Sequence, residues 1–228
     1  MKKIEKLKRI LAIAAVGAAL TSGTLYAAGE PASLDGDTVD YNMKTGVITA
    51  TGNVLMTKGS ARVAGAKAVY NSKTEEGNIT GGVIAQKEDM RMTAAECMTD
   101  GKDHMIATGD VHGQKADKTF AGERVDYFAP DEYVLMETGG TVTSKDGTIT
   151  ADRLEGWLKE DRYKGTGHAH LVSPPKKLEA GGDQLDYFGQ QQGKAILTGN
   201  AWAIQDNNTL NSSRLTIYIA DDGNAKVE

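Results

Sequence analysis

The sequence predicts an all-β protein, a long antiparallel meander of about 13 to 14 strands folded into a V. Three features of the 228 residues indicate this fold class. A Thr-Gly pair recurs about every 30 residues, turn-forming clusters arrive about every 14 residues, and the segments between the clusters are rich in Val, Ile and Thr. Evenly spaced short segments of this kind, separated by turn signals, are typical of all-β architecture.

Two landmarks define the internal repeat. The threonines of the Thr-Gly pairs are Thr51, Thr80, Thr108, Thr138, Thr166 and Thr198. A second landmark has an apolar centre, and its copies are DTVDY (37–41), KAVYN (67–71), ECMTD (96–100), ERVDY (123–127), DRLEG (152–156), DQLDY (183–187) and SRLTI (213–217). Both landmarks keep a period of about 30 residues, so the chain contains six to seven repeats of one structural unit.

Each repeat contains two strand-like segments joined by a short turn. Turns such as NMKTG (42–46) lie within repeats, and turns such as KADK (115–118) lie between them. Connections this short join antiparallel neighbours, because a parallel pair needs a linker of a dozen or more residues. The segments therefore pair in chain order.

The Thr-Gly pairs fall within the strands and not in the turns. Glycine inside a strand usually marks a bulge or a sharp bend, so a column of glycines at one height predicts that the sheet creases along a line. The expected bend glycines are Gly52, Gly81, Gly109, Gly139, Gly167 and Gly199. The alternative is a flat sheet in which these glycines are incidental bulges.

The crease would make two wings face each other across an apolar interior. Residues two apart share one face of a strand, so counting from each Thr-Gly pair and from the centre of each second landmark gives the expected lining. Those residues are Val39, Val54, Met56, Val69, Val83, Met98, Val111, Val125, Leu154, Leu171, Leu185 and Leu215. Leu55, Ile84, Val142 and Trp202 fall on the opposite face by the same count.

Residues 1–28 have the pattern of a cleaved export signal. A basic start, MKKIEKLKR, precedes the apolar stretch ILAIAAVGAAL and small residues near Ala27 and Ala28. A membrane-anchored start is the alternative. Residues 29–228 are then expected to form one exported domain with a net charge of about −9, because the first 27 residues carry five Lys or Arg against one Glu and the whole chain carries −5. Without clustered cations, nucleic-acid binding is not expected.

The candidate reactive groups do not favour an enzyme. Cys97 is the single cysteine, and burial as a small apolar side chain is expected. His168 and His170 could hold a metal only with a third ligand, so no metal or other cofactor is expected. An acidic column recurs with the repeat and is interpreted as a solvated ladder and not as paired catalytic carboxylates. The column consists of Asp37, Glu96, Glu123, Asp152 and Asp183.

The segment GDTVDYNMKTGVITATGNVLMTKGSARVAGAKAVYN (36–71) resembles the repeat of the periplasmic lipopolysaccharide-transport family of LptA, the OstA-like or organic-solvent-tolerance-like domain. The resemblance is close across 34–86 and continues more weakly to about 218. It implies a twisted β-jellyroll whose groove holds the acyl chains of lipid A, in the periplasm. It also implies as partners an inner-membrane extraction complex, an outer-membrane insertion complex and further copies of the chain joined head to tail.

The sequence leaves alternatives open. The later repeats depart from the Asn-Val signature, so the chain is either the bridge protein of the pathway or a paralogue. Segments 34–41 and 209–219 are the expected free edges, since terminal strands carry unpaired backbone groups that can add a strand. A structural or adhesive repeat protein without lipid is the second hypothesis. A polysaccharide-binding solenoid is the third, disfavoured by hairpin turns and only two tryptophans.

Overall fold

The structure is a computed structural model that describes residues 32–189, 192–219 and 225–227. The predicted export signal at 1–28 lies outside the described residues. The strands are β1 (Ala32–Asp35), β2 (Thr38–Asn42), β3 (Val47–Lys58), β4 (Ala61–Asn71), β5 (Glu76–Lys87), β6 (Met90–Asp100), β7 (His104–Lys115), β8 (Lys118–Phe128), β9 (Tyr133–Met136), β10 (Gly140–Ser144), β11 (Gly147–Ala151), β12 (Arg153–Trp157), β13 (Arg162–Ser173), β14 (Leu178–Phe188), β15 (Lys194–Gln205), β16 (Asn208–Ile219) and β17 (Ala225–Val227). One short 3₁₀ helix, η1 (Pro174–Lys176), joins β13 to β14.

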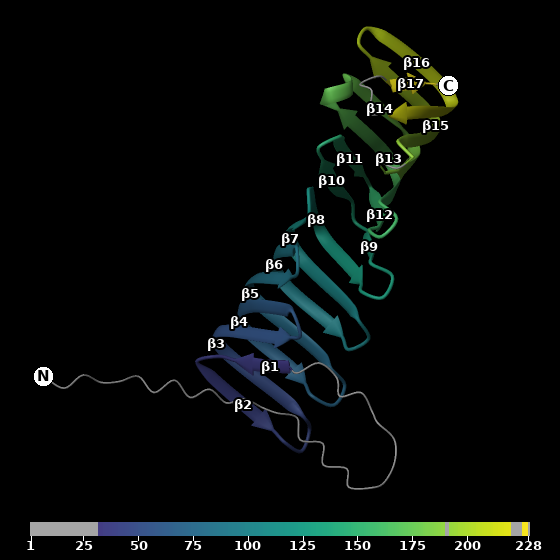
Figure 1. The fold of residues 1–228 in the computed structure, drawn as a ribbon. Helices are drawn as coiled ribbons and strands as arrows, with labels where there is room; N and C mark the ends of the chain where they lie inside the picture. Colours follow the sequence, from purple (N-terminus) through teal and green to yellow (C-terminus); the bar gives the residue numbers. More distant parts are fainter. Residues whose placement is uncertain (1–31, 190–191, 220–224, 228) are drawn as a thin grey trace, which may run out of the picture.

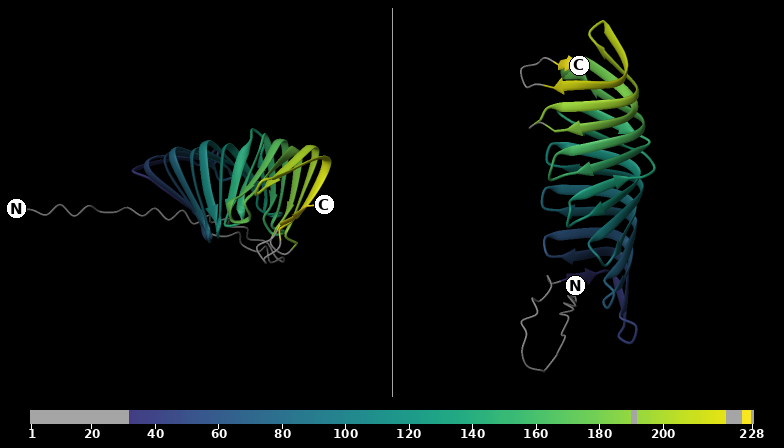
Figure 2. Two further views of the ribbon diagram at one scale, coloured as in Figure 1. Left: turned by 90° about the horizontal axis from the view of Figure 1, so that it is seen from above. Right: turned by 90° about the vertical axis from the view of Figure 1, so that its right-hand side faces the viewer.

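All 17 strands belong to one sheet, and every pairing is antiparallel. The strands stack in chain order along an elongated, twisted molecule, with β1 and β2 at one end and β16 and β17 at the other (Figures 1 and 2). The predicted all-β meander is therefore confirmed. Three of the expected strands are each interrupted, as β1 and β2, β9 and β10, and β11 and β12, which accounts for the larger number of strands.

A β-bulge interrupts the pairing at each Thr-Gly pair inside a long strand. The register shifts between Thr51 and Val54, and equivalent shifts follow Thr80, Thr108, Thr166 and Thr198. At the remaining pair, Thr138-Gly139, the strand breaks between β9 and β10. All six glycines have φ between +72° and +91°. In each long strand the next residue also has a positive φ, and these residues are Asn53, Gly82, Asp110, His168 and Asn200.

The bulges divide the sheet into two wings. We call wing A the part formed by β1, β10, β11 and the hairpin ends near Lys58–Ala61, and wing B the part formed by β2, β9, β12 and the ends near Asn71–Glu76. Lys58 Nζ lies 2.9 Å from Glu75 Oε2, although these residues lie at opposite ends of β4. Eleven extended residues span roughly 35 Å, so the two ends meet only because the sheet folds back at the crease. The long strands therefore form a V.

Wing B carries a ladder of side chains that pair directly across successive strands. Successive strands contribute one directly paired residue each, in the order His104, Phe128, Tyr133, Trp157, Arg162, Phe188, Lys194 and Tyr218. The ring of His104 stacks on that of Phe128 at 4.2 Å, and the Arg162 guanidinium lies 4.6 Å from the Trp157 ring. Cross-strand aromatic and cation–π pairs of this kind stabilise neighbouring strands, so the ladder ties β7 to β16.

The crease requires glycine at the bend position, and mutation can test this requirement. At Gly199, φ is +72° and an added Cβ would lie 2.2 Å from Asp183 Oδ2. Gly199→Ala should lower the free energy of unfolding by about 1 to 3 kcal/mol, because a strained backbone and a clash coincide. Urea denaturation followed by circular dichroism would measure the change.

Gly82→Asn is the matched control for this variant. Gly82 occupies the position of Asn53 in the first long strand, with φ of +75° and no atom within 4 Å of an added Cβ. Gly82→Asn should leave the free energy of unfolding almost unchanged, since Asn tolerates the left-handed region. Equal stability of the two variants would contradict the assigned role of the crease.

Candidate functional site

Most of the predicted lining residues face the space between the wings. Val54, Val83, Val111, Val125, Leu154, Leu171, Leu185 and Leu215 are buried, and Val39 and Met56 are partly buried against the same core. Cross-strand pairs connect them into rows. On wing B, one row runs from Val39 through Ala50 to Ala68, and on wing A another runs from Met56 through Val63 to Ala85.

One predicted lining residue, Val69, lies on the outer face, and for this residue the sequence-based assignment was wrong. Met98 is partly buried and lines the cavity described below. Val69 is 40% exposed, whereas Ala68 beside it is buried. Ala50 of β3 pairs with Val39 of β2 on one side and with Ala68 of β4 on the other. Ala68, not Val69, therefore corresponds to Val39. The second landmark was thus aligned one residue too late in this repeat, and a slip of one residue exchanges the faces of a strand.

Tyrosine and asparagine carried the signal for the correct alignment. Tyr41 and Tyr70 both pair with Ile48, so DTVDYN (37–42) corresponds to AKAVYN (66–71). Beside Met98, Cys97 is a further inward residue, since it is buried and pairs with the buried Ile79 and Ala107. Of the residues assigned to the opposite face, Leu55 and Ile84 are exposed, but Val142 is buried and pairs with Phe120.

The acidic column has a structural role at the crease. Asn53 Nδ2 donates to Asp37 Oδ2 at 2.9 Å, and Asp37 N–H donates to the Gly52 carbonyl at 2.8 Å. The pairs His168–Asp152, at 2.7 Å, and Asn200–Asp183, at 3.1 Å, repeat the side-chain contact. These aspartates therefore bind the side chain of the residue that follows the bend glycine. Glu96 accepts from Asn78 instead, and Glu123 is exposed.

The two histidines of the His-x-His pattern have separate acidic partners. The Asp152 carboxylate raises the pKa of His168 above its usual value, while His170 Nε2 lies 3.0 Å from Glu179 Oε1. Among the described residues, no three His, Cys, Asp or Glu side chains are grouped as metal ligands would be. The part of the chain that the structure describes also contains no helix with the length and hydropathy needed to cross a membrane.

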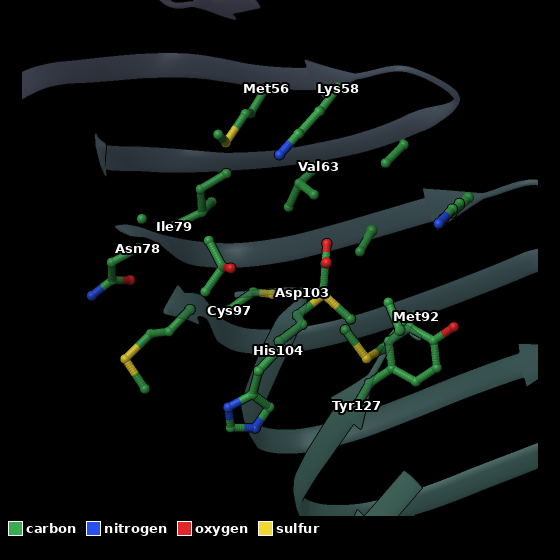
Figure 3. Close-up of a pocket in the computed structure, with 18 of the residues that line it drawn as sticks. Met56, Lys58, Val63, Asn78, Ile79, Met92, Cys97, Asp103, His104 and Tyr127 are labelled. Atoms are coloured by element: carbon green, nitrogen blue, oxygen red, sulfur yellow. The ribbon is translucent and has the colours of Figure 1, made fainter. Parts of the chain in front are cut away.

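A cavity of about 230 Å³ opens between the wings in the amino-terminal half. Figure 3 shows Met56 and Val63 of wing A on one side of it and Ile79 and Cys97 of wing B on the other. Its lining is mainly apolar and includes further methionines, Met90, Met92, Met98 and Met105. Methionine is flexible and polarisable, so this lining can adapt to apolar ligands of different shape.

A second cavity of about 130 Å³ continues along the interior. Phe120, Val134, Met136 and Leu154 line it, and Met90 lines both cavities. The two cavities together follow the inside of the V across β3 to β13. Sequence reasoning predicted an apolar interior but not that it would be hollow here.

The interior becomes filled toward the carboxyl terminus. In the first half of the wing B row Ala50, Ala68, Cys97 and Ala107 are small, and the larger Ile79 lies between Ala68 and Cys97. In the second half Met136, Leu154, Leu185, Leu197 and Leu215 are large, and Gly165 lies between Leu154 and Leu185. Tyr163 and Tyr187 add two buried rings 6.2 Å apart. The cavity of about 230 Å³ lies in the first half, where the wing B row contains three alanines, and the cavity of about 130 Å³ lies where the larger side chains begin.

Comparison with known proteins places this geometry in a family. The model of the family described as "LptA/(LptD N-terminal domain) LPS transport protein" matches residues 5–76, 33–162 and 100–223. Its matches overlap, as expected when one model fits an internal repeat at several positions. No curated protein matches the sequence.

One solved structure with similarity is that of LptH, described as the LptA homologous periplasmic component of the conserved lipopolysaccharide transport device from Pseudomonas aeruginosa. It is 16% identical, and the alignment covers 46% of this chain and 80% of that chain with a TM-score of 0.43.

The cysteine in the cavity wall gives a direct chemical test of the site. Cys97 is buried as predicted, and burial together with Glu96 raises the pKa of its thiol to about 12. The reactive thiolate is then scarce at neutral pH, so iodoacetamide should label native protein at pH 8 far more slowly than protein unfolded in urea. Mass spectrometry would measure the two rates. Equal rates would place Cys97 on the surface and contradict its position in the cavity wall.

Proposed function

Because the chain belongs to the LptA/LptD N-terminal family of lipopolysaccharide transport proteins, we propose that it carries lipopolysaccharide with the acyl chains of lipid A held between its wings. The observation that supports this is the methionine-rich cavity between Met56 and Tyr127, on the inner side of the folded sheet. An amphiphile with several long apolar tails fits such a space, because its head can remain outside while its tails are sheltered.

Energetics favour acyl chains as the cargo. Each buried methylene contributes about 0.8 kcal/mol, so even partly sheltered chains of a dozen carbons would bind strongly. Met92, Met105 and Val63 offer no strongly polar group that would fix one position. A ligand bound mainly through apolar contact can move along the groove in small steps, which suits a carrier that passes its cargo on.

The competing interpretation is a structural repeat protein without cargo. That role requires a filled interior, and the second half, with Leu185 and Leu197 fully buried, meets this requirement. The first half does not, because a cavity lined by Met56, Met92 and Met105 lies between its wings. We therefore assign lipid binding to the first half and structural support to the second.

Export and assembly complete the proposal. Residues 1–28 would direct the chain to the periplasm, and residues 29–228 would act there as one unit between an inner-membrane extraction complex and an outer-membrane insertion complex. Copies would join through their free edges. β2 pairs only with β3, and β17 covers only Ile217–Ile219 of β16 within the described residues. Both ends thus present unpaired backbone groups to another chain.

Photocrosslinking at neighbouring residues tests the cargo. A photoreactive residue at Met56, which lines the cavity, should crosslink radiolabelled lipopolysaccharide, and unlabelled lipid A should compete. The same residue at Leu55, which is 38% exposed on the opposite face, is the matched control and should give little crosslinked lipid. Equal labelling at both positions, or none at either with no lipid retained on gel filtration, would exclude the groove as the binding site.

Sedimentation tests the head-to-tail assembly. Tyr41 and Met43 are 44% and 79% exposed beside the free edge of β2. The mature chain should form concentration-dependent multimers, and replacing both residues by Asp should weaken association by about tenfold or more, since apolar contact is lost. Leu55→Asp, also an exposed apolar residue but away from the edge, should not. A single monomeric species at all concentrations would show that the edges are capped.

A further inference from the structure

Three lysine–carboxylate pairs join the free ends of the two wings. Lys58 at the end of β3 pairs with Glu75 in the β4–β5 turn at 2.9 Å. Farther along the V, Lys115 Nζ lies 2.9 Å from Glu132 Oε2, and Lys118 Nζ lies 3.0 Å from Asp161 Oδ1. In each pair the lysine belongs to wing A and the carboxylate to a turn of wing B. The pairs therefore cross the mouth of the V opposite the crease.

These lysines also line the two cavities. Lys58 and Glu75 belong to the wall of the first cavity, and Figure 3 shows Lys58 beside Met56 on the same side of β3. Lys115 and Lys118 belong to the wall of the second. The apolar space thus ends at a row of cations, each held by a carboxylate from the opposite wing.

The pairs are exposed enough to open readily. Side-chain exposure is 48% and 52% in the Lys58 pair and 32% and 31% in the Lys115 pair. Ion pairs that contact water contribute little to stability, so their separation opens the mouth at small cost. Lys58 and Lys115 stay charged. The hydrogen bond with Glu75 raises the pKa of Lys58, and although burial acts to lower the pKa of Lys115, pairing with Glu132 raises it.

We propose that Lys58, Lys115 and Lys118 are headgroup contacts of the groove, and that each exchanges its carboxylate for an anionic group of the lipid when acyl chains enter sideways between the wings. This inference rests on the proposed function. Tails inside the V necessarily leave the head of the lipid at the mouth, where these cations lie. Lysine binds phosphate as a point charge, without a fixed geometry, and can therefore follow a moving ligand from one site to the next.

The carboxylates explain how an acidic protein can keep such a row of cations. In the empty state Glu75, Glu132 and Asp161 neutralise the lysines, which limits the binding of unrelated anions. An anionic amphiphile competes successfully because its tails add apolar binding that a free anion lacks. The expected ligand class is accordingly an acylated lipid with a phosphorylated head, in preference to free phosphate or an uncharged lipid.

Neutralising the two sides of the pairs should shift affinity in opposite directions. The triple variant Lys58→Gln, Lys115→Gln, Lys118→Gln should bind phosphorylated lipid A about tenfold more weakly and dephosphorylated lipid A as well as the unmodified protein does. The double variant Glu75→Gln, Glu132→Gln frees two lysines and should bind phosphorylated lipid A several-fold more tightly. Equilibrium binding of radiolabelled lipids to the mature chain would measure both, and circular dichroism would verify folding.

Lys177→Gln is the matched control. Lys177 lies 3.4 Å from Asp206, but both residues belong to neighbouring hairpin ends of wing A, so their pair does not cross the mouth. Its loss should leave the affinity for both lipids unchanged. An equal effect of this variant would indicate a general charge effect and overturn the assignment.

The remaining outcomes separate this inference from the proposed function. If the triple lysine variant lost affinity for phosphorylated and dephosphorylated lipid A to the same extent, the lysines would only hold the wings together. The headgroup role would then be wrong, while the proposal of lipid binding would stand. If inorganic phosphate at millimolar concentration displaced phosphorylated lipid A completely, the lysines would form a free-phosphate site, which also contradicts the inference. If the unmodified protein bound neither lipid, the proposed function itself would fail.

Discussion

The fold depends on a backbone bend made of two consecutive residues with positive φ. Glycine occupies the first position in every long strand that carries a Thr-Gly pair, and the second position is Asn, Asp, His or Gly. These are the residues that adopt the left-handed region at least cost. The bulge they form shifts the pairing register at one height in successive strands, so the sheet folds along a line. The interior, the mouth and the distinction between inner and outer faces all follow from that line.

The same bend is reinforced by side chains in some repeats. Where Asp precedes the inward residue, as at Asp37, Asp152 and Asp183, its carboxylate binds the second residue of the bulge. Where Ala occupies that place, as at Ala66 and Ala95, the bend glycine approaches its Cβ closely instead. Two local solutions thus produce one geometry, which explains how the repeats diverge in sequence while the crease stays aligned.

Much of this could be predicted from the sequence, because the evidence was periodic. The strand meander, the crease glycines and the burial of Cys97 all follow from spacing and residue type. The orientation of Val69 did not, because a degenerate motif can be aligned one residue away without changing its apolar character, and one residue reverses the face. The hollow first half and the lysine pairs were also missed. Both depend on side chains from different repeats meeting across the V, and no local pattern records such a meeting.

Because the structure is a repeat, the length of the molecule can change without any change in the rest of the fold. Each strand pairs with neighbours close to it in the chain, so one hairpin adds two strand spacings, or about 9.5 Å, and needs no new contacts elsewhere. Gain or loss of a hairpin preserves the crease and the orientation of every other strand. The length of a protein assembled in this way can be adjusted by changing the number of hairpins. The side chains of its interior need not change when its length does.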